Sequence, residues 1–268
     1  MGQQIAVFGG GVMGEALLSG LVRSGIGPDR LVVTERRGDR AAELHERYGV
    51  TVVDNAEAAA SADTLVLVVK PQDMTALLDE LAPAIRPGAL VVCLAAGITT
   101  AFLEERLPAG TPVVRVMPNT PALVDEGMAA ISPGLHCDES HLEEAEQLLS
   151  AVGKVVRVAE KHQDAVTAIS GSGPAYIFYV VEAMIEAGVL LGLPRATAND
   201  LVVQTLVGAA KMLKETGEHP TVLRENVTSP AGTTVAALRA LDDHKVRAAF
   251  LSAMEAARDR SRELAAGD

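Results

Sequence analysis

A glycine-rich turn near the N-terminus limits the folds open to this chain more than any other feature. A continuous apolar run at residues 5–8 has the length and composition of a buried parallel strand, and it leads directly into Gly9, Gly11 and Gly14 at G-x-G-x-x-G spacing. Apolar residues at roughly helical spacing follow, up to a stop at Gly25. A strand, a glycine-rich turn and a helix in this order predict the first unit of a doubly wound, Rossmann-type sheet.

Each of the three glycines has a physical role in such a unit. The first permits the tight turn, the second lets the backbone approach a pyrophosphate, and the third lets the helix pack closely on the strand. The pyrophosphate then accepts hydrogen bonds from free N–H groups at the positive end of the helix. The spacing alone also occurs in ordinary tight turns, but its place between a strand and a helix favours a dinucleotide site. The predicted cofactor contacts here are Gly9, Gly11, Val12, Met13 and Gly14.

Three charged residues follow the second predicted strand, Leu31 to Thr34, at the position that reads the ribose of a dinucleotide. An acidic side chain about 20 residues after the glycines binds the ribose diol of NAD, whereas an arginine there binds the 2′-phosphate of NADP. Glu35 therefore favours NAD, while Arg36 and Arg37 favour NADP. A plainer interpretation is that all three are solvated loop charges. We expect NADP(H), with NAD(H) as the alternative and with Glu35 and Arg36 as contacts.

Later strands bring further candidates to the same edge of the sheet, because the carboxyl ends of strands in a doubly wound sheet face the ligand crevice. Lys70 follows the apolar run 64–69 and is expected near the cofactor, although a lysine after a strand is often merely solvated. Small residues after the run 89–94 leave room for a ring system. Two prolines close to Asn119 stiffen the loop that follows the run 113–116.

Composition and charge argue against several classes of protein. A net charge of −12 disfavours a nucleic-acid or anionic-membrane partner, and an aromatic content of 3% without Trp disfavours base-stacking platforms. Two cysteines in 268 residues do not make a disulfide framework, and Cys93 lies in an apolar run and is expected in the core. No stretch of membrane-spanning length lacks a charge, and nothing at the N-terminus resembles a signal peptide, so we expect a cytoplasmic protein.

The periodicity changes after residue 160, where the strand pattern ends. We expect a dinucleotide-binding domain over residues 1–160 and an all-helical domain over residues 161–268. A long helix over residues 175–191 is apolar around most of its circumference, with Glu182 and Glu186 as exceptions. Such a helix must be buried nearly all round, and the rest of the helical domain is too short to bury it. We therefore expect an obligate dimer in which a second copy covers part of this helix.

A polar segment interrupts the apolar helices of the second half at residues 223–238. Its residues Ser229 to Thr234 place hydroxyls and free backbone N–H groups just before an apolar helical run that starts at Val235. This arrangement suits a small carboxylate by the same physics that suits a phosphate. The alternative is that the segment is simply a well-capped helix start.

Several segments together resemble one known family over nearly the whole chain. The similarity is carried by VKPQ at 69–72, AAGI at 95–98, RVMPNTPA at 115–122, DAVTAISGSGPAYIF at 164–178 and ENVTSPAGTT at 225–234. These segments resemble the Δ1-pyrroline-5-carboxylate reductases, which make proline. The last two are specific to that family among Rossmann-type reductases.

The resemblance implies a nucleotide-binding N-terminal domain, an all-helical C-terminal dimerisation domain, and interlocked dimers that commonly assemble into decamers. It implies that the substrate carboxylate and ring nitrogen bind in a loop supplied by the other subunit, with Thr234 closest to the nitrogen. The substrate contacts expected on this basis are Ser229, Gly232, Thr233 and Thr234. The further cofactor contacts are Asn55, Val69, Lys70, Pro71, Ala96 and Asn119, and Asn55 is also expected to cap a short helix. No metal is expected.

The chain departs from the family pattern at two positions. The family loop usually reads S-P-G-G-T-T, whereas Ala231 replaces the first glycine, which predicts that this position needs no positive φ angle. The nucleotide turn ends in Gly14 where many members have alanine, a difference that we expect not to matter. The family usually prefers NADP, and Glu35 is the residue that argues against this preference here.

The implied reaction is hydride transfer from C4 of the nicotinamide to C5 of (S)-1-pyrroline-5-carboxylate, which gives L-proline. An iminium carbon is already a strong electrophile, so the protein must mainly align two rings and hold a carboxylate. No lysine occurs between His162 and Ala210, where carbonyl-reducing relatives need a proton donor. Thr234 is expected to orient the ring nitrogen rather than to act as an acid. The alternatives are a β-hydroxyacid dehydrogenase of the same layout and a non-catalytic sensor that binds NADP(H).

Overall fold

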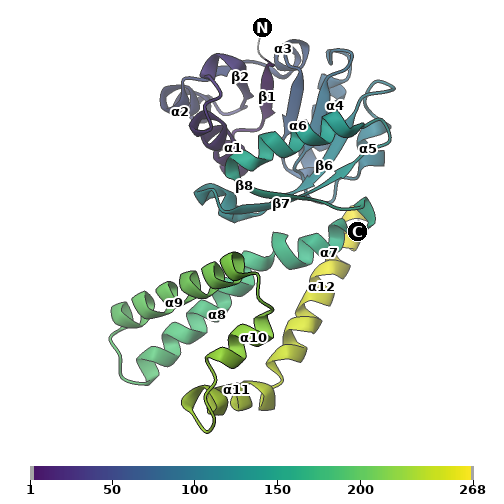
Figure 1. Ribbon diagram of the computed structural model, residues 1–268. Coiled ribbons are helices and arrows are strands. Elements are labelled where there is room, and N and C mark those ends of the chain that lie inside the picture. Colours follow the sequence, from purple (N-terminus) through teal and green to yellow (C-terminus); the bar gives the residue numbers. More distant parts are fainter. Residues whose placement is uncertain (1–2, 267–268) are drawn as a thin grey trace. The chain divides into compact units, whose positions relative to one another are not determined.

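The computed structural model describes residues 3–266, which divide into two compact units (Figure 1). The first unit comprises Met1–Ser172 together with Ala257–Asp268, and the second comprises Gly173–Ala256. These units and the predicted domains 1–160 and 161–268 divide the chain at different places. The physical reason is that the C-terminal residues return to the sheet unit, where the Ser261 hydroxyl donates a 2.8 Å hydrogen bond to the Asp164 carboxylate.

The first unit is built on an eight-stranded sheet in the order β3-β2-β1-β4-β5-β6-β7-β8. The strands are β1 Ile5–Phe8, β2 Leu31–Thr34, β3 Thr51–Val52, β4 Thr64–Leu67, β5 Leu90–Cys93, β6 Val113–Met117, β7 Gly127–Pro133 and β8 Gly153–Arg157. The first six run parallel, whereas β7 pairs antiparallel with β6 and parallel with β8. From β1 the strand order runs to one edge of the sheet through β2 and β3 and to the other through β4, β5 and β6. This change of order between β1 and β4 is where doubly wound sheets bind their ligands.

Helices cover both faces of this sheet, as predicted for a doubly wound fold. They are α1 Val12–Arg23, α2 Gly38–Tyr48, α3 Asn55–Ser61, α4 Met74–Leu81, α5 Thr100–Glu104 and α6 Glu139–Leu149. One core cluster joins α1, α2 and α6 to one face, and a second joins α3, α4 and α5 to the other. The expectation that Asn55 caps α3 is wrong. Asp54 is the cap, because its carboxylate accepts a 2.8 Å hydrogen bond from the backbone N–H of Glu57.

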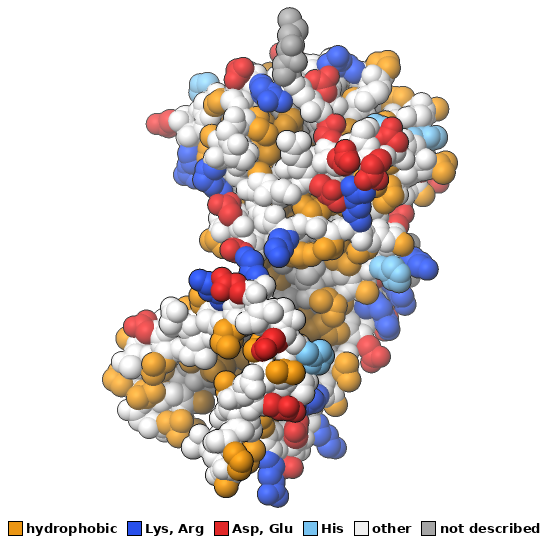
Figure 2. Space-filling model, in the orientation of Figure 1, with side chains coloured by type: hydrophobic (Ala, Val, Ile, Leu, Met, Phe, Trp, Pro, Cys, Tyr) orange, Lys and Arg blue, Asp and Glu red, His pale blue; other side chains and the backbone are white. Residues whose placement is uncertain are grey.

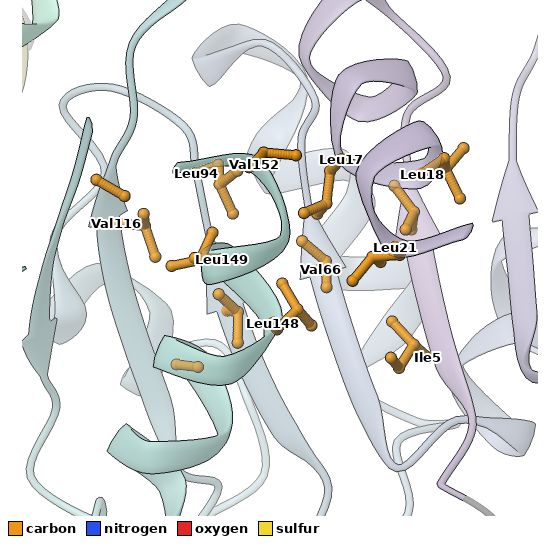
Figure 3. Packing of buried hydrophobic residues seen from close by; sticks show 14 of the residues in the cluster. Ile5, Leu17, Leu18, Leu21, Val66, Leu94, Val116, Leu148, Leu149 and Val152 are labelled. Atoms are coloured by element: carbon orange, nitrogen blue, oxygen red, sulfur yellow. The ribbon is translucent and has the colours of Figure 1, made fainter. Parts of the chain in front are cut away.

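The apolar strands are continuous runs because both of their faces are buried. On one face, Leu17 and Leu21 of α1 lie beside Val66 of β4 and Leu148 of α6 (Figure 3). The alternate residues of the same strands pack under the helices of the other face. Cys93 is fully buried in that second cluster, and burial raises the pKa of its thiol to about 12, so it is an inert core residue as predicted.

After the sheet the chain is helical, as predicted. The remaining helices are α7 Gln163–Val166, α8 Gly173–Leu190, α9 Arg195–Thr216, α10 Pro220–Asn226, α11 Thr233–Asp243 and α12 Val246–Ala266, with a π-helical turn at Thr167–Gly171. Helices α8 and α9 pack against each other.

The helical unit does not bury its own apolar surface. No residue of α8 is buried in the single chain, and the exposed fractions of Phe178 and Tyr179 are 66% and 75%. Hydrophobic side chains are spread over the visible face of this unit (Figure 2). By length and composition alone, the helical stretch Glu160–Leu190 is also apolar enough to cross a membrane. Either a second copy or another apolar phase must therefore cover α8.

Candidate functional site

A cavity of about 340 Å³ lies at the carboxyl ends of β1, β2 and β4, next to the point where the sheet order reverses. It brings together Gly9, Gly11, Glu35, Arg36, Asn55, Val69 and Lys70, all of which were predicted as cofactor contacts. These residues come from four separate stretches of the chain. The parallel strands collect them because each strand ends at the same edge of the sheet.

The glycine turn shows a different constraint at each position. Gly9 has a φ angle of +109°, which glycine adopts without strain, and a Cβ there would lie 3.2 Å from the carbonyl carbon and oxygen of Val68. A Cβ on Gly11 would meet nothing within 4 Å. A Cβ on Gly14 would lie 2.0 Å from the carbonyl oxygen of Gly9, a distance that requires the backbone to move. The expectation that alanine would serve equally well at position 14 is therefore wrong for this backbone.

The start of α1 is arranged to receive an anion. Gly11 is its N-cap residue with extended backbone, and it has no side chain to cap the first turn. The N–H groups of that turn thus remain available beside the cavity, with the positive end of the helix dipole behind them. Val12 is 65% exposed at this position. These observations fit the diphosphate of a dinucleotide.

A charged network lies behind the turn, and the sequence reasoning missed it. The Nε of Arg40 on α2 donates a 2.9 Å hydrogen bond to the carbonyl oxygen of Gly10, and its guanidinium also pairs with the carboxylate of Glu15. Glu15 further accepts hydrogen bonds from Arg47 at 2.5 Å and from the Tyr48 hydroxyl at 2.9 Å. A free carboxylate in the first turn of α1 would repel a diphosphate, and this network neutralises it. The sequence feature that could have indicated this network is the spacing of Arg40 and Arg47, which places both side chains on one face of α2.

Opposite charges meet at one end of the cavity, beside the carboxyl end of β2. Arg36 and Asp73 both line the cavity, and their guanidinium nitrogen and carboxylate oxygen are 3.2 Å apart. The Glu35 carboxylate accepts a 3.0 Å hydrogen bond from the backbone N–H of Arg37. Asn55 donates a 2.6 Å hydrogen bond to the carboxylate of Glu80. Both of the predicted ribose-reading residues, Glu35 and Arg36, therefore lie at this end.

Two other predicted contacts, Pro71 and Ala96, line a second cavity of about 680 Å³ within the same unit. It lies at the carboxyl end of β5 and is also lined by residues of the π-helical turn and of the C-terminal end of α12. Gln72 lines both cavities, so the two adjoin along the sheet edge. A dinucleotide needs two such compartments, because its base and its nicotinamide lie at opposite ends.

Asn119 lies apart from both of these cavities, and its side-chain amide is engaged in the fold. Its amide nitrogen donates a 3.1 Å hydrogen bond to the carbonyl of Ser170, and its oxygen accepts a 2.8 Å hydrogen bond from the N–H of Met128. It lines a small apolar pocket together with Met13. Asn119 thus joins the end of β6 to β7 and to the π-helical turn, and no local pattern indicated this role.

The predicted substrate loop lies in the helical unit. The backbone turns through Ser229 to Gly232, with the N–H of Gly232 donating a 3.1 Å hydrogen bond to the carbonyl of Ser229. Gly232 is the N-cap residue of α11, and no side chain caps the helix. The interpretation of the segment as a well-capped helix start is therefore wrong. The first-turn N–H groups of α11 stand beside the Thr233 and Thr234 hydroxyls, an arrangement that suits a carboxylate.

Ala231 corrects another expectation. Its φ angle is +57°, so the position that glycine usually occupies in the family does adopt the left-handed conformation here. Ala231 is the third residue of the turn that the Gly232 N–H closes on the Ser229 carbonyl. The left-handed conformation costs an alanine about 1–2 kcal/mol because its Cβ approaches the following carbonyl. Among residues 3–266, no cluster of His, Cys, Asp or Glu could hold a metal ion.

The fold and the cavity together define a Rossmann-type oxidoreductase with a helical second unit. The family model described as "NADP oxidoreductase coenzyme F420-dependent" matches residues 4–97, and the model described as "Pyrroline-5-carboxylate reductase dimerisation" matches residues 160–264. The pyrroline-5-carboxylate reductase of Corynebacterium melassecola is 52% identical, with coverage of 97% of this chain and 98% of the relative. The chain belongs to the pyrroline-5-carboxylate reductase family.

Solved structures agree with this assignment. The pyrroline-5-carboxylate reductase of Coxiella burnetii superposes with a TM-score of 0.94 at 39% identity, covering 98% of both chains. The Plasmodium falciparum pyrroline carboxylate reductase, solved with NADP bound, superposes with a TM-score of 0.88 at 29% identity, again over 98% of both chains. The similarity therefore spans both compact units.

We predict that alanine affects coenzyme binding at one glycine of the turn and stability at another. Gly11→Ala is expected to leave thermal stability unchanged, because its methyl group enters open space, but to weaken coenzyme binding by about tenfold or more by filling that space. Gly14→Ala is expected to lower the free energy of unfolding by about 1–3 kcal/mol through overpacking against Gly9. Thermal melts and NADPH titrations of both variants check this. Equal loss of stability in the two variants would contradict it.

The pKa of Glu15 predicts a pH-dependent contribution to stability. Burial raises this pKa, but the hydrogen bonds from Arg40 and Tyr48 and the nearby positive charges outweigh it, so the net pKa lies below its ordinary value of 4.5. The ionised Glu15 therefore stabilises the fold above that value, and the contribution is lost as the pH falls through the folded pKa. Glu15→Gln should lower the melting temperature at about pH 7, with a difference from wild type that shrinks as the pH falls below 4.5. The exposed Glu46→Gln is the control, and a pH-independent difference would refute the assignment.

Ala231→Gly should stabilise the substrate loop. Glycine adopts the left-handed conformation without strain, and this gain exceeds its greater entropy in the unfolded chain, so we expect the free energy of unfolding to rise by about 0.5–1 kcal/mol. Ala237→Gly inside α11 is the matched control and should lower it by about 1 kcal/mol. Chemical denaturation of the two variants measures both changes. A loss of stability in Ala231→Gly would show that the loop carries no such strain.

Proposed function

We propose that this protein reduces (S)-1-pyrroline-5-carboxylate to L-proline with NADPH, the last step of proline biosynthesis. The observation that carries the proposal is 52% identity to a pyrroline-5-carboxylate reductase over nearly the full length of both chains. The glycine turn and the uncapped start of α11 support it, because the reaction needs one site for a dinucleotide and one for a small carboxylate.

The cavity of the sheet unit is proposed to hold the coenzyme. The free N–H groups at the start of α1 bind the diphosphate, and Glu35 and Arg36 meet the adenosine ribose. The adjoining cavity beside Pro71 and Ala96 receives the nicotinamide end. The description of the family matched by residues 4–97 and the NADP-bound relative both support NADP(H) as the coenzyme. When bound, NADPH supplies the hydride for the reaction.

The loop ahead of α11 is proposed to hold the substrate. Hydroxyls of Ser229, Thr233 and Thr234, together with the N–H groups of the first turn of α11, bind the carboxylate and orient the ring. The imine carbon is electrophilic without further activation, so orientation is the main contribution of the protein. Thr234 hydrogen-bonds the ring nitrogen, which fixes the face of the carbon that accepts the hydride.

The helical unit is proposed to form a homodimer. The dimerisation family that residues 160–264 match and the exposed apolar side chains of α8 support this arrangement. A membrane is the less favourable cover, because Glu182 and Glu186 lie within the same helix and an ionised carboxylate in lipid is costly. Assembly of dimers into a decamer, and a cytoplasmic location, are further parts of the proposal that rest on the family resemblance.

Thr234→Ala should reduce kcat/KM by about 5- to 150-fold, the equivalent of about 1–3 kcal/mol for one buried hydrogen bond to the reacting ring. Thr234→Ser keeps the hydroxyl and should retain most of the activity. The measurement is the oxidation of NADPH by pyrroline-5-carboxylate, with a panel of hydroxy acids and NADP as a comparison. Unchanged kinetics in Thr234→Ala would remove this residue from the site, and turnover of a hydroxy acid alone would refute the proposed reaction.

Combining two impaired variants in one dimer should restore activity if the substrate loop comes from the partner copy. A heterodimer of Gly11→Ala and Thr234→Ala chains then contains one site with both changes and one site with neither. We expect co-expressed chains, separated by two affinity tags, to show close to half of wild-type activity per heterodimer. Activity no higher than that of the single-variant dimers would mean that each site is built from one chain.

A further inference from the structure

An ion pair spans the ribose end of the coenzyme cavity. Arg36 follows β2, and Asp73 ends the 3₁₀ turn Pro71–Asp73 after β4, so the two side chains reach the cavity from different segments. Their nitrogen and oxygen are 3.2 Å apart. The Arg36 side chain is 79% exposed, whereas that of Asp73 is 36% exposed. Because the pair is open to solvent, it is held weakly, and a stronger anion can replace Asp73 as the partner of Arg36.

The third charged group at this end is fixed in place. The Glu35 side chain is only 11% exposed, and its carboxylate accepts the N–H of Arg37 at 3.0 Å. It also lies under the glycine turn, since a Cβ built on Gly10 would be 3.2 Å from its Oε2 atom. Glu35 therefore presents the same acceptor whether or not the ribose carries a phosphate. Arg37 pairs with Glu35 at 3.5 Å, so among the residues that line the cavity Arg36 is the arginine that can change its partner.

The charge balance of the cavity determines how the partner of Arg36 affects coenzyme binding. Its charged lining residues are Glu35, Asp73 and Glu80 against Arg36 and Lys70. A 2′-phosphate carries nearly two negative charges and three strong acceptor oxygens. When Arg36 pairs with such a phosphate, the charge of Asp73 loses its partner and repels the phosphate at short range. A ribose with a free 2′-hydroxyl leaves the Arg36–Asp73 pair intact.

We infer that Asp73 is a specificity-determining residue that limits the preference of this cavity for NADPH over NADH by competing for Arg36. The inference rests on the proposed coenzyme role of the cavity. A neutral side chain at position 73 frees Arg36 and removes the repulsion, so it strengthens the binding of 2′-phosphorylated nucleotides. It leaves nucleotides without that phosphate unaffected, because a 2′-hydroxyl carries no charge for Arg36 to pair with or for Asp73 to repel.

The test is calorimetric binding of two coenzyme fragments, 2′,5′-ADP and 5′-AMP, to the full-length protein. Asp73→Asn is expected to tighten 2′,5′-ADP by about 3- to 10-fold at low salt, with the gain shrinking as salt is added, and to leave 5′-AMP within about twofold. The matched control is Glu80→Gln, which removes one charge from the same cavity but pairs with Asn55 rather than Arg36. It should change 2′,5′-ADP binding less than Asp73→Asn does.

Arg36→Gln tests whether Asp73 acts through Arg36. It should weaken 2′,5′-ADP and should abolish the gain from Asp73→Asn in the double variant, because Asp73 acts through Arg36. Equal effects of Asp73→Asn and Glu80→Gln, equal gains for both fragments, or a gain that persists without Arg36 would each overturn the inference.

The fragments also separate this inference from the proposed reaction, because their binding needs no turnover. A protein that shows the Asp73 effect but does not reduce pyrroline-5-carboxylate would refute the proposed function and leave the inference standing. A protein that reduces this substrate and shows no Asp73 effect would refute the inference and leave the proposed function standing. Failure of the wild-type protein and all variants to bind either fragment would refute the inference, and failure to bind NADPH as well would refute both.

Discussion

The rest of the sheet unit depends on the close contact between the start of α1 and the end of β1. A Cβ on Gly14 would come within 2.0 Å of the Gly9 carbonyl oxygen, so only glycine lets the helix approach the strand this closely. That approach places the positive end of α1 at the point where the sheet order reverses. Arg40 holds the same turn from behind through the carbonyl of Gly10. The cavity is thus a consequence of backbone packing, and its side chains adjust a site that the main chain has already made.

Charge balance governs this cavity. Of the carboxylates in and around the cavity, Glu15 and Asp73 are held in different ways. Glu15 is neutralised by a network that includes two arginines and a tyrosine, and its pKa is lowered as a result. Asp73 has only an exposed arginine, which the ligand itself can use. The first arrangement protects diphosphate binding, whereas the second leaves the ribose end open to competition between coenzymes.

The two units fold under different constraints. The sheet unit buries its strands between two layers of its own helices and needs no partner for that purpose. The helical unit leaves α8 without one buried residue, so its stability is tied to whatever covers that helix. The proposed substrate loop lies in this second unit, with Ala231 in a left-handed conformation ahead of α11. In the proposed function, completing the site and covering the apolar helix are the same event, the association of two copies.

Asn55 and Val69 were expected at the cavity from the family resemblance. Local patterns in the chain were enough to predict the strands, the long helices, the inert Cys93 and the place of the glycine turn, Glu35, Arg36 and Lys70, because hydrophobic periodicity and glycine spacing act over a few neighbouring residues. They failed where a side chain's role depends on a distant segment. The chain alone did not show that the Asn119 amide is engaged by Ser170 and Met128, or that Asp73 faces Arg36. These pairings are decided by tertiary packing, since they depend on distances between residues far apart in sequence, which no short-range pattern specifies.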